Sequence, residues 1–416
     1  NSDYNGGGAL MIENSLCTVT KCEFTNNETQ ANNFGGAIKI ASSSPTIFSC
    51  VFTGNKNKVN SGGAIYIDEY SAPVLSQNNF INNYSSSRGG AIYTKNPNFS
   101  VTGGLFVGNW SYLGGGIATD GTKEISLDGV KALSNEANAS IGGSGGFLYI
   151  GNGASSSRFV NCVFAGNKSN ERNGVVEVNG ASKFINTTFY GNEASSDGGI
   201  SLLFTDDSIT LQNCILWNNS DSNGYEIWAY SGDANAEYSL LESSKSPGIN
   251  LVSNNLSSDP EFVDPVGPDL IVGTLDDDLR LLSTSSAINM GSDSFLNYNE
   301  SDIVGIVRDS SPDLGAYEYF QNSNPIYKGA TNFNIQEGSA IIAEINGTDA
   351  DGHSLSYSII GGTDESMILV DANTGVLRFD EIPDYEYPYD SNKDNQYFVT
   401  INISDGYASI QVNLIV

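Results

Sequence analysis

The sequence predicts an all-β protein in which a parallel β-helix of about nine coils is followed by a β-sandwich. Three observations support this. Short motifs recur every 26 to 28 residues in the first half of the chain. Within each period, short runs of alternating apolar and polar residues lie between Gly, Asn and Ser clusters. The final stretch, of about ninety residues, is instead a compact series of alternating strands, which is typical of a β-sandwich.

Two signals define each repeat. The first is a Gly pair followed by an apolar strand, as in "SGGAIYI" from Ser61, with variants at Phe34, Arg88 and Leu113. The second is Phe followed three residues later by Asn, and it occurs at Phe24/Asn27, Phe52/Asn55, Phe80/Asn83, Phe106/Asn109, Phe164/Asn167 and Phe189/Asn192. Coils stacked at the strand spacing of ~4.8 Å would place the Phe residues in an interior column and let each Asn bond the turns of adjacent coils. Glycine permits the close approach of stacked backbones at the corners.

Four of the five cysteines lie two residues before the Phe position or its substitute: Cys22, Cys50, Cys162 and Cys214. This places them on one inward column, so we expect small buried thiols. A disulfide between Cys17 and Cys22, or between Cys22 and Cys50, is the alternative, and the odd count leaves one thiol free in any case.

The tandem "GGAI" and "FxxN" motifs resemble the repeats of the polymorphic outer-membrane proteins of chlamydiae and of secreted bacterial right-handed β-helix proteins. The resemblance covers roughly residues 6–242. It implies a right-handed parallel β-helix. It leaves activity open, because this scaffold carries adhesins, autotransporters, polysaccharide lyases and glycosidases alike.

Beyond residue 242 the repeat lapses. The stretches "SSDPEFVDP" and "SPDLGAYEY" read as mainly irregular structure and resemble the segment that closes many secreted bacterial β-helices. An open solenoid end exposes core and strand edges, so we expect this segment to cap the last coil. The predicted divisions are therefore residues 1–242 for the repeats, 243–321 for the cap and 322–416 for the sandwich.

Acidic residues of the sandwich gather at strand ends rather than being scattered: Glu337, Asp349, Asp351, Asp384, Glu386 and Asp405. Hard oxygen ligands at loop ends are what Ca²⁺ requires, and two Asp separated by one residue can direct both carboxylates at one ion. The alternative is a set of solvated loop carboxylates.

The stretches "TDADG", "LSYSI", "VDANTGVLRF", "PDYE" and "ISDG" occur in the order of a cadherin-type repeat, which this module resembles. The resemblance implies a Ca²⁺ site at the junction with the preceding β-helix, formed by Asp349, Asp351 and Asp405 with Asn322 or Asn324 of the linker. It also implies that Glu337, Asp384 and Glu386 face a following domain. The linker "NSNP" lacks the Asp of the family pattern, and this departure weakens the junction site.

Catalytic chemistry finds little support in the sequence. Residues 1–242 contain no histidine, and His353 reads as a loop residue beside the predicted metal loop. Acidic residues of the repeats, such as Asp68 and Glu177, fall on different columns and lack a recurring basic partner. A lyase or glycosidase site cannot be assembled from them. The sequence therefore favours a non-enzymatic role.

Tyr66, Tyr93 and Tyr149 occupy the central position of the strands "AIYI", "AIYT" and "FLYI". The two-residue period of a strand points this position away from the Ile core. We expect the three rings on one outer face, with Trp228 and Tyr230 as its extension. Simple cross-strand packing that stiffens the sheet is the favoured interpretation. A flat ligand-binding surface for sugar rings or a partner is the alternative.

The formal charge of −30 arises from 48 acidic and only 18 basic residues. Such a surface repels nucleic acid and anionic lipid and favours cations. No apolar run approaches the ~20 residues that span a bilayer. We expect a piece of a larger extracellular protein, secreted or on the bacterial cell surface. It would act as an adhesin or stalk stiffened by Ca²⁺, with a surface glycan or protein and its own neighbouring domains as partners. A polysaccharide-degrading enzyme and a filament subunit are the alternatives.

Overall fold

The computed structural model describes residues 6–29, 33–121, 124–138, 144–151, 156–172, 174–177, 180–196, 200–202, 208–229, 234–297 and 300–416, apart from the side chains of residues 172, 200–202, 228 and 229. Residue contacts divide the chain into two compact units, residues 1–319 and 320–416. Each unit is described separately below. In the described part of the chain, no helix is long and apolar enough to cross a membrane.

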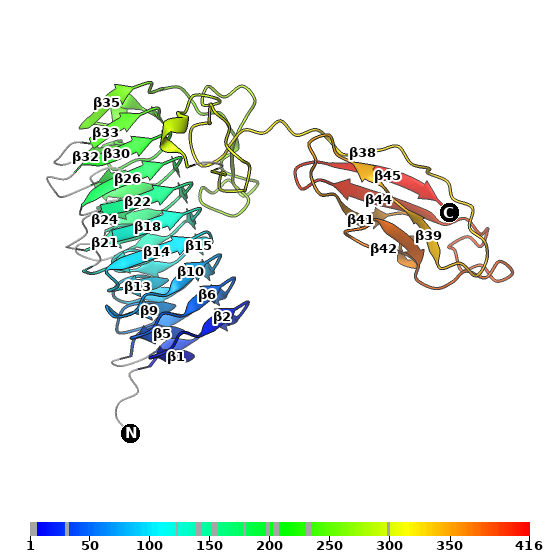
Figure 1. The fold of residues 1–416 in the computed structure, drawn as a ribbon, viewed down its shortest axis with the longest axis horizontal. Coiled ribbons are helices and arrows are strands. Elements are labelled where there is room, and N and C mark those ends of the chain that lie inside the picture. Colours follow the sequence, from blue (N-terminus) through cyan, green and yellow to red (C-terminus); the bar gives the residue numbers. More distant parts are fainter. Residues whose placement is uncertain are drawn as a thin grey trace. The chain divides into compact units, whose positions relative to one another are not determined.

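The first unit is a stack of coils whose strands form four long parallel sheets (Figure 1). Sheet A contains β1 (Leu10–Glu13), β5 (Ile38–Ala41), β9 (Ile65–Ile67), β13 (Ile92–Thr94), β17 (Ile117–Thr119), β21 (Leu148–Ile150) and β25 (Val176–Glu177). Sheet B contains β2 (Thr18–Thr20), β6 (Thr46–Phe48), β10 (Val74–Ser76), β14 (Asn98–Thr102), β18 (Glu124–Asp128), β22 (Ser156–Val160), β26 (Ala181–Ile185), β30 (Ile209–Gln212), β33 (Ala234–Glu237) and β35 (Ile249–Ser253).

The other two long sheets complete each coil. Sheet C contains β3 (Glu23–Thr25), β7 (Val51–Thr53), β11 (Asn79–Ile81), β15 (Leu105–Val107), β19 (Lys131–Leu133), β23 (Val163–Ala165), β27 (Thr188–Tyr190), β31 (Ile215–Trp217) and β34 (Leu240–Leu241). Sheet D contains β4 (Glu28–Thr29), β8 (Lys56–Asn57), β12 (Tyr84–Ser85), β16 (Trp110–Ser111), β20 (Glu136–Ala137), β24 (Lys168–Arg172) and β28 (Glu193–Ser196). A further parallel pair joins β29 (Ile200–Leu202) to β32 (Ile227–Ala229). Each described sheet thus holds seven to ten coil strands, against the expected nine coils, and sheet B continues past residue 242.

The register between coils places equivalent residues of the repeat side by side. Phe24 pairs with Phe52, Phe52 with Phe80, and Phe80 with Phe106. Their rings stack at centroid distances of 4.9, 4.9 and 4.7 Å. The second half of the motif forms a parallel ladder of side chains, of which the first is half-buried and the rest are buried: Asn27, Asn55, Asn83, Asn109, Asn135, Asn167, Asn192 and Asn219. In this asparagine ladder, each Oδ1 from Asn55 onward accepts the backbone N–H and the Nδ2–H of the preceding ladder residue, at 2.7 to 3.1 Å.

One coil breaks the phenylalanine column and repairs it locally. Ala132 stands at the Phe position of sheet C, between Phe106 and Phe164. The vacant space is filled by Phe147, whose ring lies 5.4 Å from both of those rings. Phe147 itself occupies a position that is Gly in the coil before and Val in the coil after. A Cβ on Gly116 of the coil before would meet the Phe147 ring at 2.4 Å, so glycine is needed there.

The cysteines follow the predicted column except at one position. Cys50, Cys162 and Cys214 are buried and free, and burial raises the pKa of Cys162 and Cys214 to about 12. Cys17 and Cys22 are also free, so neither proposed disulfide is present in this structure. The expectation that Cys22 is buried is wrong. It lies in the first described coil, where only the coil of Cys50 packs against it, and its backbone N–H donates to Cys50 Sγ at 3.5 Å.

Residues 243–319 begin within the coil stack, where β35 is the last strand of sheet B, and the described residues after this strand lie along the side of the stack. This segment includes two 3₁₀ turns (Ser243–Lys245 and Asp293–Phe295) and the antiparallel pair β36 (Phe262–Asp264) and β37 (Asp278–Leu281). Its Phe262, Leu279, Leu281 and Leu314 form one apolar cluster with side chains that point outward from sheet C: Leu133, Val163, Ala165, Tyr190, Ile215 and Leu240. The segment therefore covers a lateral face, which the expected capping role did not foresee.

A buried arginine fastens this segment to the coils. Arg308 donates from Nη1 to Glu318 Oε2 at 2.9 Å and from Nη2 to Asn161 Oδ1 at 3.2 Å. Its side chain is fully buried. Burial, with the nearby Asp313 charge, raises the pKa of Glu318 to about 7. A buried charge without its partner is costly. This network therefore favours one packing position of the segment against the coils.

The second unit is built from antiparallel strands around a single core. One sheet has the order β39 (Ile341–Glu344), β43 (Val376–Phe379), β42 (Ile368–Val370), and the other β41 (Ser356–Gly361), β44 (Phe398–Ser404), β45 (Ser409–Ile415). A short pair joins β38 (Ile326–Tyr327) to β40 (Gly347–Thr348), and one 3₁₀ turn spans Glu365–Met367. Both sheets contribute to the core, through Ile345, Tyr357, Leu377, Ile401 and Leu414. This two-sheet arrangement leaves the loops at either end free to carry polar groups.

Candidate metal centre

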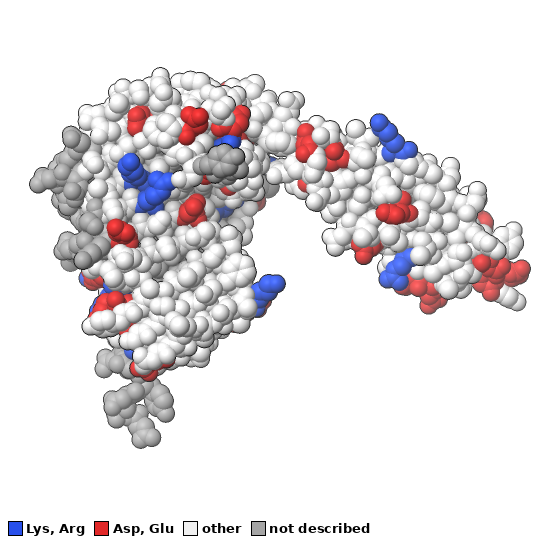
Figure 2. Space-filling view, viewed as in Figure 1, with Lys and Arg blue, Asp and Glu red and all other residues white. Residues whose placement is uncertain are grey.

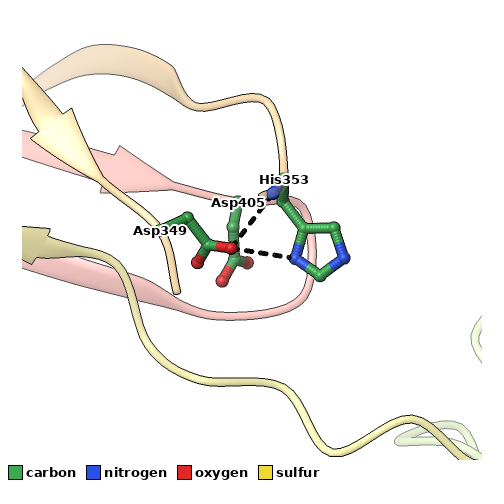
Figure 3. A group of neighbouring side chains, drawn as sticks. All are labelled: Asp349, His353 and Asp405. Carbon is green, nitrogen blue, oxygen red and sulfur yellow. Dashed lines mark hydrogen bonds and ion pairs between the residues drawn. The ribbon is translucent and has the colours of Figure 1, made fainter. Parts of the chain in front are cut away.

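The principal acidic cluster of the second unit lies on loops that follow β40 and β44. Asp349 comes directly after β40, and Asp405 comes directly after β44 (Figure 3). The loop after β40 turns sharply because Asp349 Oδ1 accepts the N–H groups of Asp351 and His353, at 2.9 and 3.0 Å. Gly352, with φ of +80°, takes the left-handed conformation that this turn requires.

These loops bring three potential ligands together. Asp349, His353 and Asp405 each present an atom within 4.8 Å of the others. The His353 ring faces the same Asp349 oxygen at 3.4 Å (Figure 3). Asn322 joins the cluster, since its Nδ2 donates to Asp405 Oδ2 at 2.9 Å. We call Asn322, Asp349, Asp351, His353 and Asp405 the acidic cluster.

Asp351 and Asn324 are more exposed to solvent than the other predicted ligands at this site. Asp351 is exposed, and its Oδ2 accepts the backbone N–H of Ser323 at 2.6 Å, so it ties the linker to the turn. Asn324 is also exposed, and no hydrogen bond recorded for the described residues connects it to the cluster. Of the two linker asparagines, Asn322 is the one placed to act as a ligand.

The surroundings of Asp405 favour its ionised form. Burial alone would raise the pKa of this carboxyl group. The N–H groups of Ala408 and Tyr407, the Asn322 amide and the His353 ring outweigh burial, so the pKa lies below its ordinary value. Asp405 is therefore a carboxylate at neutral pH, held ready to bind a cation.

Two oxygen atoms of the cluster are buried without a hydrogen-bond partner. They are Asn322 Oδ1 and Asp349 Oδ2, and the His353 Nδ1 atom is in the same state. The Asp349 side chain is only 1% exposed. Leaving a buried acceptor unsatisfied costs on the order of 1–3 kcal/mol, and more when it is charged. A cation bound by the cluster would supply the missing partner of such oxygens, so the residue types present fit a metal ion.

The donor set favours a hard cation. Carboxylate oxygens of Asp349 and Asp405 and the amide oxygen of Asn322 are the ligand types that Ca²⁺ takes. The imidazole of His353 is a borderline donor that suits Zn²⁺ better. It also packs against the aromatic rings of Phe320 and Tyr407, at centroid distances of 5.0 and 4.9 Å, which holds it in place.

The other predicted ligands form a second group. Glu337, Asp384 and Glu386 also present atoms within 4.8 Å of one another. Glu337 and Glu386 are exposed and Asp384 is half-buried. A third group in the first unit, Asp269, Asp276 and Asp277, lies in a loop whose N–H groups of Gly273 and Thr274 already bond Asp277. The second group is thus more open to solvent than the acidic cluster.

The alternative of an exposed aromatic surface is wrong for Tyr66 and Tyr93. Tyr66 and Tyr93 do point away from the Ile core, but they are only 6% and 5% exposed. They pack with Phe34, Ala118 and Tyr149 in a separate small cluster. Burial, followed by the charges of Glu69 and Asp68, raises the pKa of Tyr66 to about 12.

Neighbouring loops account for this burial. Phe34 lies 4.5 Å from the Tyr66 ring, and the Tyr93 hydroxyl donates to Asp120, which pairs with Arg88. The expected extension cannot be followed, since Tyr230 lies outside the described residues and the side chain of Trp228 is not described. Cross-strand packing is therefore the role that the structure shows for Tyr66 and Tyr93.

Sequence reasoning missed one member of the acidic cluster. The sequence indicates only a loop residue at His353. In the structure its ring Nδ1 lies close to Asp349 Oδ1, which also accepts the backbone N–H of His353. The spacing in "DADGH" is the signal, because a tight turn over Gly352 returns the fifth residue to the first. The sequence motif alone does not say whether the ring turns inward.

Comparison with known proteins agrees with the fold of the first unit. A family model described as "Right handed beta helix region" matches residues 1–132. The first unit is a parallel β-helix. A search of curated proteins found no match. Among solved structures, the crystal structure of human protocadherin-24 EC1-2 matches with 22% identity and a TM-score of 0.19, over 23% of this chain and 43% of that chain.

Proposed function

We propose that this chain is a calcium-stabilised part of an extracellular surface protein that serves as an adhesin or stalk. The observation that carries the proposal is the pair of buried, unsatisfied oxygens in the acidic cluster, Asn322 Oδ1 and Asp349 Oδ2. The order of the motifs around these residues, which resembles a cadherin-type repeat, supports Ca²⁺ as the ion. The acidic surface and the stacked repeats of the β-helix support an extracellular, load-bearing role.

Calcium would act by joining loops that are distant in sequence. Asn322, Asp349 and Asp405 come from three separate segments of the second unit. Only the folded state presents these oxygens together, so binding stabilises folding by mass action. The more exposed group of Glu337, Asp384 and Glu386 would bind a second ion more weakly, and a following domain would complete it.

Calorimetry of the full chain tests the acidic cluster. With Ca²⁺ present, we expect a chelator to lower the melting temperature of the transition of the second unit, and Asp349→Ala with Asp351→Ala to mimic the chelator. At a hundredfold excess over the dissociation constant, binding stabilises by about 2.7 kcal/mol. Glu344→Ala with Glu381→Ala is the matched control, because it removes two exposed carboxylates from the same unit. A second unit whose melting ignores both chelator and mutation would refute the site.

Metal choice is tested in the same way. We expect Ca²⁺ to raise the melting temperature more than Mg²⁺, which demands tighter octahedral geometry. Zn²⁺ acting more strongly than Ca²⁺, with the effect lost in His353→Ala, would contradict a calcium site and assign the cluster to a transition metal.

The competing hypothesis is a polysaccharide-degrading enzyme on the β-helix. It predicts new unsaturated or reducing ends when the chain is incubated with acidic polysaccharides. Turnover that single Asp or Arg substitutions abolish would overturn the adhesin proposal. The filament hypothesis predicts regular polymers of purified protein, visible by electron microscopy.

A further inference from the structure

We propose that a groove over sheet B of the β-helix binds a linear anionic polysaccharide, with Arg158 and Lys183 as its charged contacts. This inference goes beyond the proposed function. It names a partner class and a place for it, and it involves the first unit alone. Because no residue of the groove belongs to the acidic cluster, the inference and the calcium site can fail independently.

The groove runs across the first halves of five neighbouring strands, β14, β18, β22, β26 and β30. Its volume is about 530 Å³. The strands are about 4.8 Å apart, so the groove crosses the coils along the direction in which they stack. A long, repetitive ligand can therefore meet an equivalent position on each coil, at a spacing comparable with the length of one sugar ring.

One column of outward positions lines the groove. The register pairs Ser100 with Ser126, Ser126 with Arg158, Arg158 with Lys183, and Lys183 with Thr210. Two cationic side chains thus stand on adjacent strands, flanked on both sides by hydroxyl groups. Figure 2 shows Lys and Arg side chains gathered at the level of β22 and β26, with separate acidic side chains around them.

This pairing of like charges is unusual in this protein. The chain has 18 basic residues against 48 acidic ones. Within the described part of the chain, neither Arg158 nor Lys183 forms an ion pair. Like charges on directly opposed cross-strand neighbours are destabilising. An anionic group between them relieves that repulsion and makes charge-assisted hydrogen bonds with both.

Acidic groups near Arg158 and Lys183 restrict where an anion can bind in the groove. Glu124 also lines the groove, and the charge of Arg158 acts on Asp128 of β18. Both acids lie on β18, at one side of the pair, while Thr210 lies on the other. We therefore place the ligand anion over Arg158 and Lys183, and neutral sugar hydroxyls over the serine positions and Glu124, which accepts hydrogen bonds.

Other classes of macromolecule fit less well. Nucleic acid carries one charge per ~1.7 Å of duplex, which two cations on a strongly acidic protein do not neutralise. An acidic peptide that binds by strand addition needs a free sheet edge. The groove instead lies on the face of central strands, which are hydrogen-bonded on both sides. A polysaccharide with widely spaced anionic groups and many hydroxyl groups matches the residues that line the groove best.

Binding of the full chain to defined glycans tests the inference. The probes are oligogalacturonate, a heparin oligosaccharide and a neutral dextran of similar length, measured by isothermal titration calorimetry with a chelator present. We expect binding to at least one anionic probe, weakening with salt, and no binding to dextran. Oligogalacturonate and heparin separate carboxylate from sulfate as the recognised group.

The groove variant is Arg158→Ser with Lys183→Thr, which copies the residues at the same column position in the flanking coils. We expect its affinity to fall by about tenfold or more. The matched control is Lys56→Ser with Lys328→Ser, which changes the net charge equally at exposed positions outside the groove and leaves affinity unchanged. Lys183→Glu alone is a second variant that should abolish binding.

Three results would overturn the inference. These are no binding of either anionic glycan to the wild-type chain, equal losses in the groove and control variants, and tighter binding of single-stranded DNA or polyglutamate than of either glycan. Circular dichroism of each variant establishes that the β-helix remains folded. If the double variant is unfolded, the Lys183→Glu result decides.

Discussion

At the scale of single residues, Glu226 is the most unusual group in the β-helix. Its side chain is fully buried, yet no cation contacts it among the described residues. Oε1 accepts the Nδ2–H of Asn219 at 3.2 Å, and Oε2 accepts the N–H of Glu242 at 3.0 Å. Burial raises its pKa to about 8, although these hydrogen bonds oppose the rise. Glu226 thus replaces the next asparagine as the acceptor at the end of the asparagine ladder.

This burial predicts a pH-dependent stability. The folded state holds the Glu226 proton more tightly than the unfolded chain does, so the free energy of unfolding falls as pH rises from about 4.5 to about 8. The loss is on the order of 5 kcal/mol. Glu226→Gln cannot ionise and should lack this fall, although one amide hydrogen is then mispaired.

Thermal unfolding of both proteins at several pH values measures the effect. The difference in melting temperature between wild type and Glu226→Gln should shift in favour of the variant as pH rises. Glu13→Gln, at an exposed position of β1, corrects for the overall charge of the protein. Parallel pH profiles for all three proteins would contradict the prediction.

At the scale of elements, the swap between Ala132 and Phe147 shows how coils compensate one another. The phenylalanine column of sheet C continues through a ring that sheet A supplies. Packing at this position is therefore a property of two sheets, and substitutions there should not be additive.

A double-mutant cycle tests this coupling. Ala132→Phe alone overfills the interior and should cost about 1–3 kcal/mol, and Phe147→Ala alone should cost about 3–5 kcal/mol through its cavity. The double variant restores the column in the pattern of the other coils and should lose much less than the sum. Chemical denaturation of the four proteins gives the coupling energy, and additive losses would show that the two positions do not share one space.

Elements that follow the repeat could be predicted from the sequence, whereas contacts made by non-periodic segments could not. The Phe and Asn columns follow from a fixed period, because parallel stacking places each residue on its equivalent. The period gives the side of a strand on which Tyr66 lies but not what covers it, since Phe34 belongs to a loop without a periodic signal. The packing of the later segment against sheet C does have a sequence signal: outward positions of sheet C are apolar in several successive coils, as at Val107, Leu133 and Val163.

The candidate metal site also has features that the sequence predicts and features that only the tertiary structure reveals. Motif order brought Asp349 and Asp405 together correctly, since both follow strands that end near one another. The role of Asn322 rather than Asn324 depends on the path of the linker, which no pattern specifies. The burial of Asp349 Oδ2 is likewise a product of tertiary packing, and it is the observation that supports the proposed cation site over a set of solvated loop carboxylates.

At the scale of the whole molecule, charge acts on both units while calcium should act on one. A net charge of −30 destabilises any compact state through self-repulsion. Raising KCl from about 10 mM to about 200 mM shortens the screening length severalfold and should raise both melting transitions. About 1 mM Ca²⁺ at constant ionic strength should raise only the transition of the second unit. A calcium response of equal size in both transitions would mean that general screening, and not the acidic cluster, is responsible.

The asparagine ladder gives the β-helix a direction. Each ladder residue from Asn27 to Asn192 donates one Nδ2–H to the Oδ1 of the next coil. From Asn55 onward, Nδ2 also donates to a backbone carbonyl of the coil before, as Asn55 does to Phe24. The side-chain carbonyls all point the same way, so their dipoles add along the stack and polarise one another. The donor end of this column meets Oε1 of the Glu226 carboxyl group, which accepts the last Nδ2–H of the ladder. A coil can therefore be stacked after Asn219 only if it supplies an acceptor, and before Asn27 only if it supplies a donor. Repeats of this kind can be duplicated within the rod in one orientation and never in reverse.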